Sequence, residues 1–289
     1  MSRNKDRLGG TTVPQDNSVP PQVIQQAAQD EGNAFSFVIP TEFVELPSGG
    51  KFYPPHHPLH NAESIEIRQM TAKEEDILTS QTLLKKGIAI DRVIKNIIVN
   101  KKIDPDSLLV GDRNAIIIAT RVSGYGNEYS TKVGCPQCGA TTEYTFDLNQ
   151  ARIYHGEDAD SLDIVNNEDG TFEVVLPRTK LTITFKLLNG RDEKVLLTGV
   201  ERDRKQKITE KTITRSLHNM MVAINGDPSP EAINYLIANI PSIDARHLRH
   251  AYRLAAPNID LSQDFECNEC GHEQTMEVPL NAEFFWPDR

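Results

Sequence analysis

Four cysteines are the residues of this sequence whose type and spacing predict chemistry most clearly. They form two Cys-x-x-Cys pairs, Cys135/Cys138 and Cys267/Cys270, each followed directly by a glycine. Two intervening residues let both thiolates of a tight turn face one ion, and the glycine permits a backbone conformation in which amides approach the sulfurs. Neither pair completes a tetrahedral site alone. We therefore expect one shared four-cysteine zinc ribbon that holds one structural Zn²⁺ per chain.

The sequence between the two pairs is far longer than in a simple zinc ribbon, so a shared ion would close the base of an inserted domain. Two redox-active dithiols, or cysteines buried without a metal, are the alternatives. No thioredoxin-like βαβ pattern surrounds either pair, which argues against the redox alternative. His272 follows Cys270 and could replace a thiolate, but four cysteines already complete the shell.

Composition and charge exclude several classes of protein. A chain of 289 residues can form one large domain or two ordinary ones. A net charge of −10 argues against broad attraction to nucleic acid or anionic membranes, and no apolar run is long enough to span a bilayer. Residues 1–10 lack the apolar stretch of a secretory signal. We expect a cytoplasmic protein without a membrane partner.

No enzyme motif is found in the sequence. A P-loop, a dinucleotide-binding fingerprint, a nucleophile elbow and a His-Glu-x-x-His motif are all absent. Catalytic zinc keeps an open coordination position, whereas four thiolates close the shell. The sequence therefore predicts neither an enzyme nor a small-molecule substrate.

Two further groups of side chains have simple structural interpretations. His56, His57 and His60 have one nearby acidic residue, Glu63, and are typical of a loop with incidental histidines. Basic residues on two predicted helices could contact phosphate, but aromatic residues suited to base stacking are not interleaved with them. These are Arg202, Arg204, Lys205, Lys207 and Lys211, and Arg246, His247, Arg249, His250 and Arg253. A solvated face or an acidic protein partner explains them better than nucleic acid.

The elements that must position the cysteines follow from capping and hydrophobic periodicity. Thr71 and Glu74 form a capping-box pattern, which predicts a helix that begins within a residue of Ala72. Further helices are expected at 88–98, 115–122, 192–202, 208–224, 230–239 and 243–254. Strands are expected at 64–68, 129–133, 142–148, 172–176 and 181–187.

These elements predict an α+β fold, predominantly helical, with short strands and a split four-cysteine zinc ribbon. We expect the following parts: a disordered N-terminal arm at 1–35, an extended docking segment plus helical subdomain at 36–133, the split ribbon and C-terminal tail at 134–150 and 265–289, and an inserted strand and helix domain at 151–264.

Several segments resemble the T4-type phage baseplate hub and hub-assembly family. They are residues 46–54 (LPSGGKFYP), 63–68 (ESIEIR) and 70–78 (MTAKEEDIL). The resemblance continues at both cysteine pairs and at residues 281–287 (NAEFFWP), and leaves the N-terminal arm outside. It implies protein–protein interaction in a contractile tail baseplate, as a retained subunit or as an assembly factor in the host cytoplasm. A zinc-ribbon nucleic-acid-binding or transcription-type protein is the alternative.

The aromatic and proline-rich segments 46–55 and 284–287 are candidate docking elements for other tail proteins. Each offers a large apolar contact area on a chain with little freedom to lose. The partner-binding candidates are Phe52, Tyr53, Phe285 and Trp286. The alternative, that these side chains pack onto the protein's own core, is equally compatible with the sequence.

Overall fold

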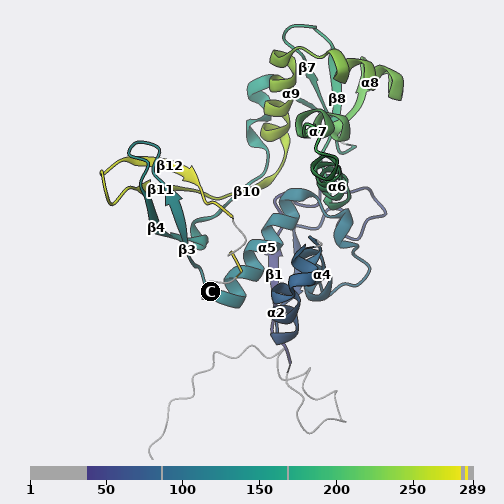
Figure 1. Ribbon diagram of the computed structural model, residues 1–289. Helices are drawn as coiled ribbons and strands as arrows, with labels where there is room; N and C mark the ends of the chain where they lie inside the picture. Colours follow the sequence, from purple (N-terminus) through teal and green to yellow (C-terminus); the bar gives the residue numbers. More distant parts are fainter. Residues whose placement is uncertain (1–37, 86, 168, 281–283, 286–289) are drawn as a thin grey trace, which may run out of the picture. The chain divides into compact units, whose positions relative to one another are not determined.

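The computed structural model describes residues 38–85, 87–167, 169–280 and 284–285 (Figure 1). The chain divides into two units, Met1–Pro40 and Thr41–Arg289. The second unit contains every helix and strand described below. The arm expected at 1–35 lies outside the described residues.

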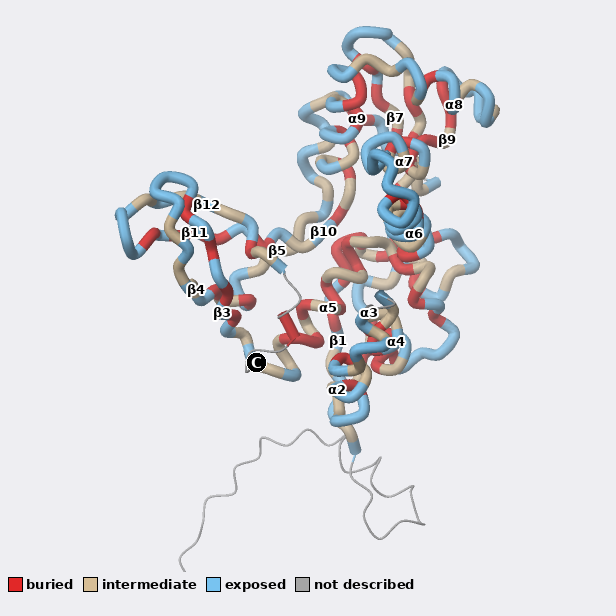
Figure 2. The backbone as a smooth tube through the Cα atoms, viewed as in Figure 1, coloured by how far each residue is buried: buried red, intermediate tan, exposed pale blue. Residues whose placement is uncertain are grey.

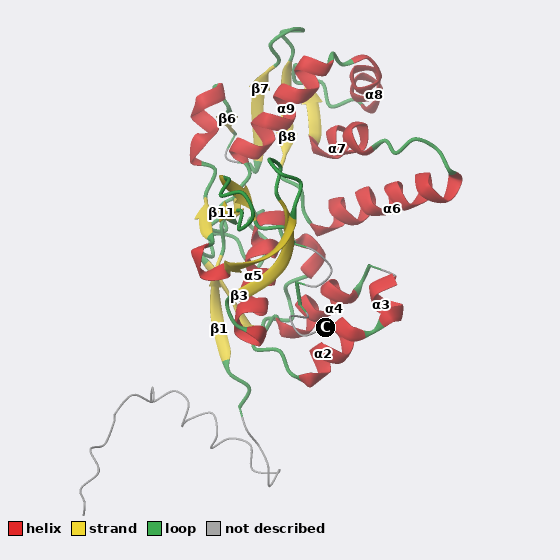
Figure 3. Cartoon of the chain, turned by 60° about the vertical axis from the view of Figure 1, so that its left-hand side comes forward, coloured by secondary structure: helices red, strands yellow, loops and turns green. Residues whose placement is uncertain are grey.

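Groups of helices and groups of short antiparallel strands follow one another along the described chain (Figure 3). The helices are α2 (Ala72–Thr79), α3 (Gln81–Lys85), α4 (Ala89–Ile97), α5 (Val110–Tyr125), α6 (Gly190–Gln206), α7 (Thr212–Met220), α8 (Pro230–Asn239) and α9 (Ser242–Ala255), with 3-10 turns η1 (Pro105–Ser107), η2 (Leu148–Gln150) and η3 (Glu157–Leu162). The strands are β1 (Thr41–Glu45), β2 (Ser64–Arg68), β3 (Glu128–Gly134), β4 (Thr141–Asp147), β5 (Arg152–Tyr154), β6 (Val165–Asn166), β7 (Thr171–Val175), β8 (Thr182–Lys186), β9 (Met221–Ile224), β10 (Asn258–Asp260), β11 (Ser262–Glu266) and β12 (Glu273–Glu277). The predicted α+β class is confirmed, but "predominantly helical" overstates the helical share, since several short strands, β5, β6, β9 and β10 among them, lie outside the predicted strands.

The first hydrophobic core is built around α5 and draws on both ends of the described chain. Its buried members come from β1, β2, α2, α4 and α5, and from the paired strands β3, β4 and β11. Cys135 and Cys267 belong to it, as do Phe284 and Phe285 near the C-terminus. The cysteine pairs are therefore continuous with this core.

The second hydrophobic core lies within the segment that separates the two cysteine pairs. A four-stranded antiparallel sheet, in the order β6-β7-β8-β9, packs against α7, α8 and α9. The buried residues of this second core lie between residues 164 and 255 (Figure 2). This range falls inside the 151–264 insertion expected from the sequence. The division into domains itself remains a prediction.

Strands β5 and β10 pair at the base of this inserted segment. Arg152 lies opposite Asp260 and Tyr154 lies opposite Asn258, so the outgoing and returning chains are hydrogen-bonded together. Helix α5 approaches this point closely, since a Cβ added to Gly111 would lie 2.0 Å from the carbonyl oxygen of Pro257. A side chain at position 111 would force the two elements apart.

Capping residues explain where several helices begin. Helix α2 begins at Ala72 as predicted, with the Glu74 carboxylate accepting hydrogen bonds from the Thr71 amide at 3.1 Å and its hydroxyl at 2.7 Å. Helix α8 begins at the predicted Pro230, where the Ser229 hydroxyl accepts a hydrogen bond from the Ala232 amide.

The helix predicted at 208–224 is wrong in its second half. Helix α7 ends at Met220, and Met221–Ile224 forms β9, which pairs with β8. Met221 and Ile224, predicted as helical, therefore lie in a strand. The run Met-Met-Val-Ala-Ile satisfies the spacing of a buried helix and of a buried strand equally, and pairing with Ile183 and Thr184 decides between them.

The buried Glu74 makes the stability of this first core depend on pH. Burial alone would raise the pKa of Glu74, but hydrogen bonds from Arg68, Thr71 and Asn96 outweigh it and hold the pKa at about 2, below the ordinary value of 4.5. The ionised form therefore stabilises the fold above about pH 4.5, and this contribution is lost as the pH falls toward 2. The full shift corresponds to roughly 3 kcal/mol.

We predict that Glu74→Gln lowers the free energy of unfolding at neutral pH, and that its difference from the wild type shrinks between pH 4.5 and 2. Urea unfolding across this range measures the difference. Asp76→Asn, at an exposed position of the same helix, serves as the control and should show no such trend. A difference for Glu74→Gln that does not change with pH would contradict the assignment.

Candidate metal centre

The four cysteines lie in the turns of two β-hairpins. Strands β3 and β4 form the first hairpin, with Cys135 and Cys138 in its turn, and β11 and β12 form the second, with Cys267 and Cys270 (Figure 1). All four sulfur atoms lie within 4.8 Å of one another. The predicted meeting of the two pairs is confirmed.

The two turns have matching hydrogen bonds. The Gly139 amide donates to the Cys135 carbonyl at 2.9 Å, and the Gly271 amide donates to the Cys267 carbonyl at 2.8 Å. Both glycines have positive φ, +73° and +67°, a region that other residues enter at a cost. The glycine after each pair therefore has the conformational role expected from the sequence.

The sulfur positions fit a tetrahedral metal ion. Cys135 and Cys270 have sulfurs 3.8 Å apart, as do Cys138 and Cys267. Ligands at the usual zinc–sulfur distance of about 2.3 Å on a regular tetrahedron are separated by roughly 3.8 Å. A disulfide requires about 2.05 Å, so neither contact is a covalent bond. These four residues could hold one metal ion.

The pKa values of Cys135 and Cys270 are shifted in opposite directions by their surroundings. The Cys138 amide has the largest effect on Cys135, and with the Gln137 amide it lowers the pKa of that thiol to about 6. The His272 amide lowers the pKa of Cys270, but burial and the three neighbouring cysteines outweigh it and raise the pKa to about 12. The closely spaced thiols resist ionisation when no cation is present. A bound cation reverses this, because its positive charge stabilises the thiolates.

Contacts beside the cysteines also hold the two hairpins together. The Gln263 side chain accepts a hydrogen bond from the Asp147 amide at 3.1 Å and donates one to the Asp147 carbonyl at 2.8 Å, as a neighbouring strand would. The Tyr144 ring packs on Phe265, with centroids 5.0 Å apart, and its hydroxyl donates to the Asp264 carbonyl. The sulfur positions therefore do not depend on the metal alone.

The histidines have structural contacts. His272 is not part of the group of potential ligands, and its carbonyl accepts a hydrogen bond from the Cys267 amide. His57 stacks on Tyr53 and hydrogen-bonds to the Ser107 hydroxyl, while His60 bonds to the Tyr53 carbonyl. Among the residues that the structure describes, the histidines at 56–60 form no metal-ligand group.

A buried carboxylate anchors the 46–54 segment. Asp112, in the first turn of α5, accepts hydrogen bonds from the Ser48 amide at 2.9 Å, the Ser48 hydroxyl at 2.6 Å and the Tyr53 hydroxyl at 2.7 Å. Burial raises the pKa of Asp112 despite these donors. Tyr53 in turn accepts a hydrogen bond from the Leu109 amide. No sequence motif marks Asp112, and its role was not foreseen.

A buried arginine anchors the C-terminal segment. Arg121, in α5, donates to the carbonyls of Phe284 at 2.6 Å, Gly126 at 2.5 Å and Glu128 at 2.9 Å. Its guanidinium also lies over the Phe284 ring, 5.8 Å from the centroid. Arg121 thereby connects the C-terminal end of α5, the start of β3 and the C-terminal segment.

The candidate docking side chains are largely internal in this chain. Tyr53 is 4% exposed and Phe285 is 5% exposed, while Phe52 is half-buried against Phe172. Trp286 lies outside the described residues. This burial is what packing onto the protein's own core predicts, and a docking role for these four residues stays a prediction.

Comparison with models of protein families identifies the family of this chain. A family model described as T4 bacteriophage base plate protein matches residues 39–286. The chain belongs to this family. No curated protein and no solved structure matches it.

Membership of the baseplate family confirms the broader part of the resemblance found in the sequence, whereas the matched description does not name the hub. The family points to a structural component of a phage tail that interacts with other phage structural proteins. No helix in the described ranges is long and apolar enough to cross a membrane.

We predict that Cys135→Ser and Cys267→Ser each lower both the bound metal per chain and the thermal midpoint of unfolding, because either change opens the same coordination shell. The double variant should be little worse than either single variant, since the two changes remove one shared interaction. Elemental analysis and calorimetry measure these effects, with His272→Asn as a control that keeps its metal. Additive losses would indicate separate sites, and full metal retention by either serine variant would show that the replaced cysteine is not a ligand.

We predict that Phe284→Ala lowers the thermal midpoint by several degrees, because removal of a buried Phe side chain costs about 3–5 kcal/mol. Phe43→Ala is the matched control, since Phe43 is 72% exposed. Truncation after Leu280 should destabilise at least as much, because it also leaves Arg121 without its Phe284 acceptor. An unchanged midpoint after truncation would instead favour a dispensable docking tail.

Proposed function

We propose that this chain is a non-enzymatic, protein-binding component of the phage baseplate hub, either as a retained subunit or as a hub assembly factor. The match to the baseplate family over residues 39–286 is the observation that carries the proposal. The hub assignment rests on the resemblance of residues 46–54, 63–68 and 70–78. Such a protein acts in the host cytoplasm while the baseplate assembles, and in the virion tail if it is retained.

We further propose that the four cysteines hold one structural zinc ion. Tetrahedral sites of four thiolates suit zinc, and two Cys-x-x-Cys turns are the usual source of such ligands. Four thiolates leave no open position for a substrate or a water nucleophile, which supports a structural role over a catalytic one. The ion would stabilise the joined hairpins and supply no reaction step.

The alternative, a zinc-ribbon protein that binds nucleic acid, is disfavoured by the charges of the ribbon. In the described β3–β4 and β11–β12 hairpins that form the ribbon, Lys132 is the single exposed lysine or arginine. The exposed carboxylates of the ribbon are Glu128, Glu143, Asp264, Glu266, Glu269, Glu273 and Glu277. A surface of this sign repels the phosphate backbone.

Quantitative mass spectrometry of purified mature particles and of baseplate assembly intermediates tests the proposal. Stoichiometric presence in mature particles would identify a retained subunit, and presence in intermediates alone would identify an assembly factor. Absence of the chain from both would contradict the proposed function.

A further inference from the structure

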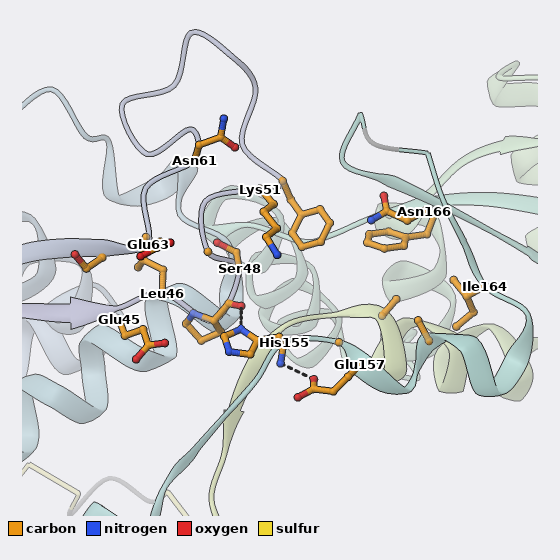
Figure 4. Close-up of a pocket in the computed structure, with 18 of the residues that line it drawn as sticks. Glu45, Leu46, Ser48, Lys51, Asn61, Glu63, His155, Glu157, Ile164 and Asn166 are labelled. Atoms are coloured by element: carbon orange, nitrogen blue, oxygen red, sulfur yellow. Dashed lines mark hydrogen bonds between the residues drawn. The ribbon is translucent and has the colours of Figure 1, made fainter.

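A cleft with a volume of about 1200 Å³ lies beside β1, and residues 46–49, 51 and 52 of the LPSGGKFYP segment form one side of it (Figure 4). In Figure 4, Lys51 extends from this segment into the cleft, with Glu45 and Glu63 nearby and Glu157, Ile164 and Asn166 across from them. The cleft exceeds the range of about 300–1,000 Å³ that small-molecule sites occupy. Its dimensions suit a segment of polypeptide better than a compact ligand.

The charged lining of the cleft is mainly acidic. Its exposed carboxylates are those of Glu45, Glu63, Glu157 and Asp160. Among the described lining residues, Lys51 is the single lysine or arginine. None of these four carboxylates forms a salt bridge with a described residue, although Glu157 accepts a hydrogen bond from the His155 amide. The cleft therefore favours a positively charged occupant.

The strand that borders the cleft has an unpaired edge. Strand β1 pairs with β2 in a two-stranded sheet, and no other described strand joins it. The Leu46 amide bonds to the Glu63 carbonyl at the end of this ladder, so the alternation of an antiparallel pair turns the backbone groups of Phe43 and Glu45 to the opposite edge. Phe43 is also 72% exposed. An unpaired edge beside an exposed aromatic is a template for strand addition.

We propose that this cleft binds an extended, positively charged segment of another baseplate protein, which adds to the free edge of β1. Backbone hydrogen bonds to Phe43 and Glu45 hold the segment, and the surrounding carboxylates select lysine or arginine side chains. This inference rests on the proposed function and identifies the surface of this chain that binds the partner. The LPSGGKFYP segment then contributes to docking as a fixed wall, held in place by Asp112.

Site-specific cross-linking tests the proposal. The photoreactive residue p-benzoylphenylalanine is incorporated at position 43, and at position 235 as the matched control, since Tyr235 is 75% exposed on α8. Baseplates assembled with each variant are irradiated, and the cross-linked peptides are sequenced by mass spectrometry. We expect position 43 to cross-link to a lysine- or arginine-rich segment of one different baseplate protein.

Charge reversal tests the same site independently. Glu45→Lys combined with Glu157→Lys should reduce the yield of the position-43 cross-link by roughly tenfold, because two attractive pairs become repulsive. Glu231→Lys, an exposed position on α8, should leave the yield unchanged. Thermal midpoints of the variants, compared with the parent protein, confirm that the fold is intact.

Three results would overturn the proposal: position 43 cross-linking no more than position 235, a cross-link to a second copy of this chain, or a yield that does not respond to charge reversal. A chain found in particles or assembly intermediates without the cross-link would overturn the cleft assignment alone. A chain absent from both would overturn the proposed function and this inference together.

Discussion

The meeting of the two cysteine turns is the constraint on which the arrangement of the chain depends. The chain leaves the first hairpin at Asp147 and re-enters the second at Ser262, and the four sulfurs bring these distant segments to one point. Strands β5 and β10 then pair directly beyond the hairpins, so both ends of the insertion are fixed. Structural zinc sites contribute about 10–16 kcal/mol of apparent binding free energy in small peptides, as much as the entire stability of many domains.

Three buried polar side chains complete the joining of distant segments. Asp112 binds the 46–54 segment, Arg121 binds the carbonyl of Phe284, and Gln263 binds the backbone of Asp147. Each makes at least one hydrogen bond to a group far away in sequence. Because an unpaired buried polar group costs about 1–3 kcal/mol, and more when it is charged, these contacts make the observed pairing of segments specific.

The sequence predicts best where a residue's local chemistry decides its role. Spacing alone indicates that Cys135 and Cys267 belong to one site, and the caps at Thr71 and Pro230 locate the starts of two helices. Prediction fails where distant partners decide, as at Met221, which joins a strand because β8 lies beside it.

The same reasoning explains why parts of the site were not foreseen. Whether Tyr53 faces a partner or the core depends on Asp112, which no local pattern links to it. The cleft brings together Glu45 and Glu157, which come from separate segments of the chain and share no motif. Composition indicated an acidic protein, but only the fold collects these carboxylates beside an edge of β1 that no other described strand joins.

X-ray absorption spectroscopy of the purified protein at the zinc and iron edges tests the central claim most directly, because it identifies the metal, its ligands and their distances together. A shared structural site predicts one zinc ion per chain with four sulfur ligands at about 2.3 Å. Iron bound by the same thiolates, or nitrogen or oxygen in the shell, would contradict a closed four-cysteine zinc site. A folded protein without metal would show that the two hairpins meet through packing alone.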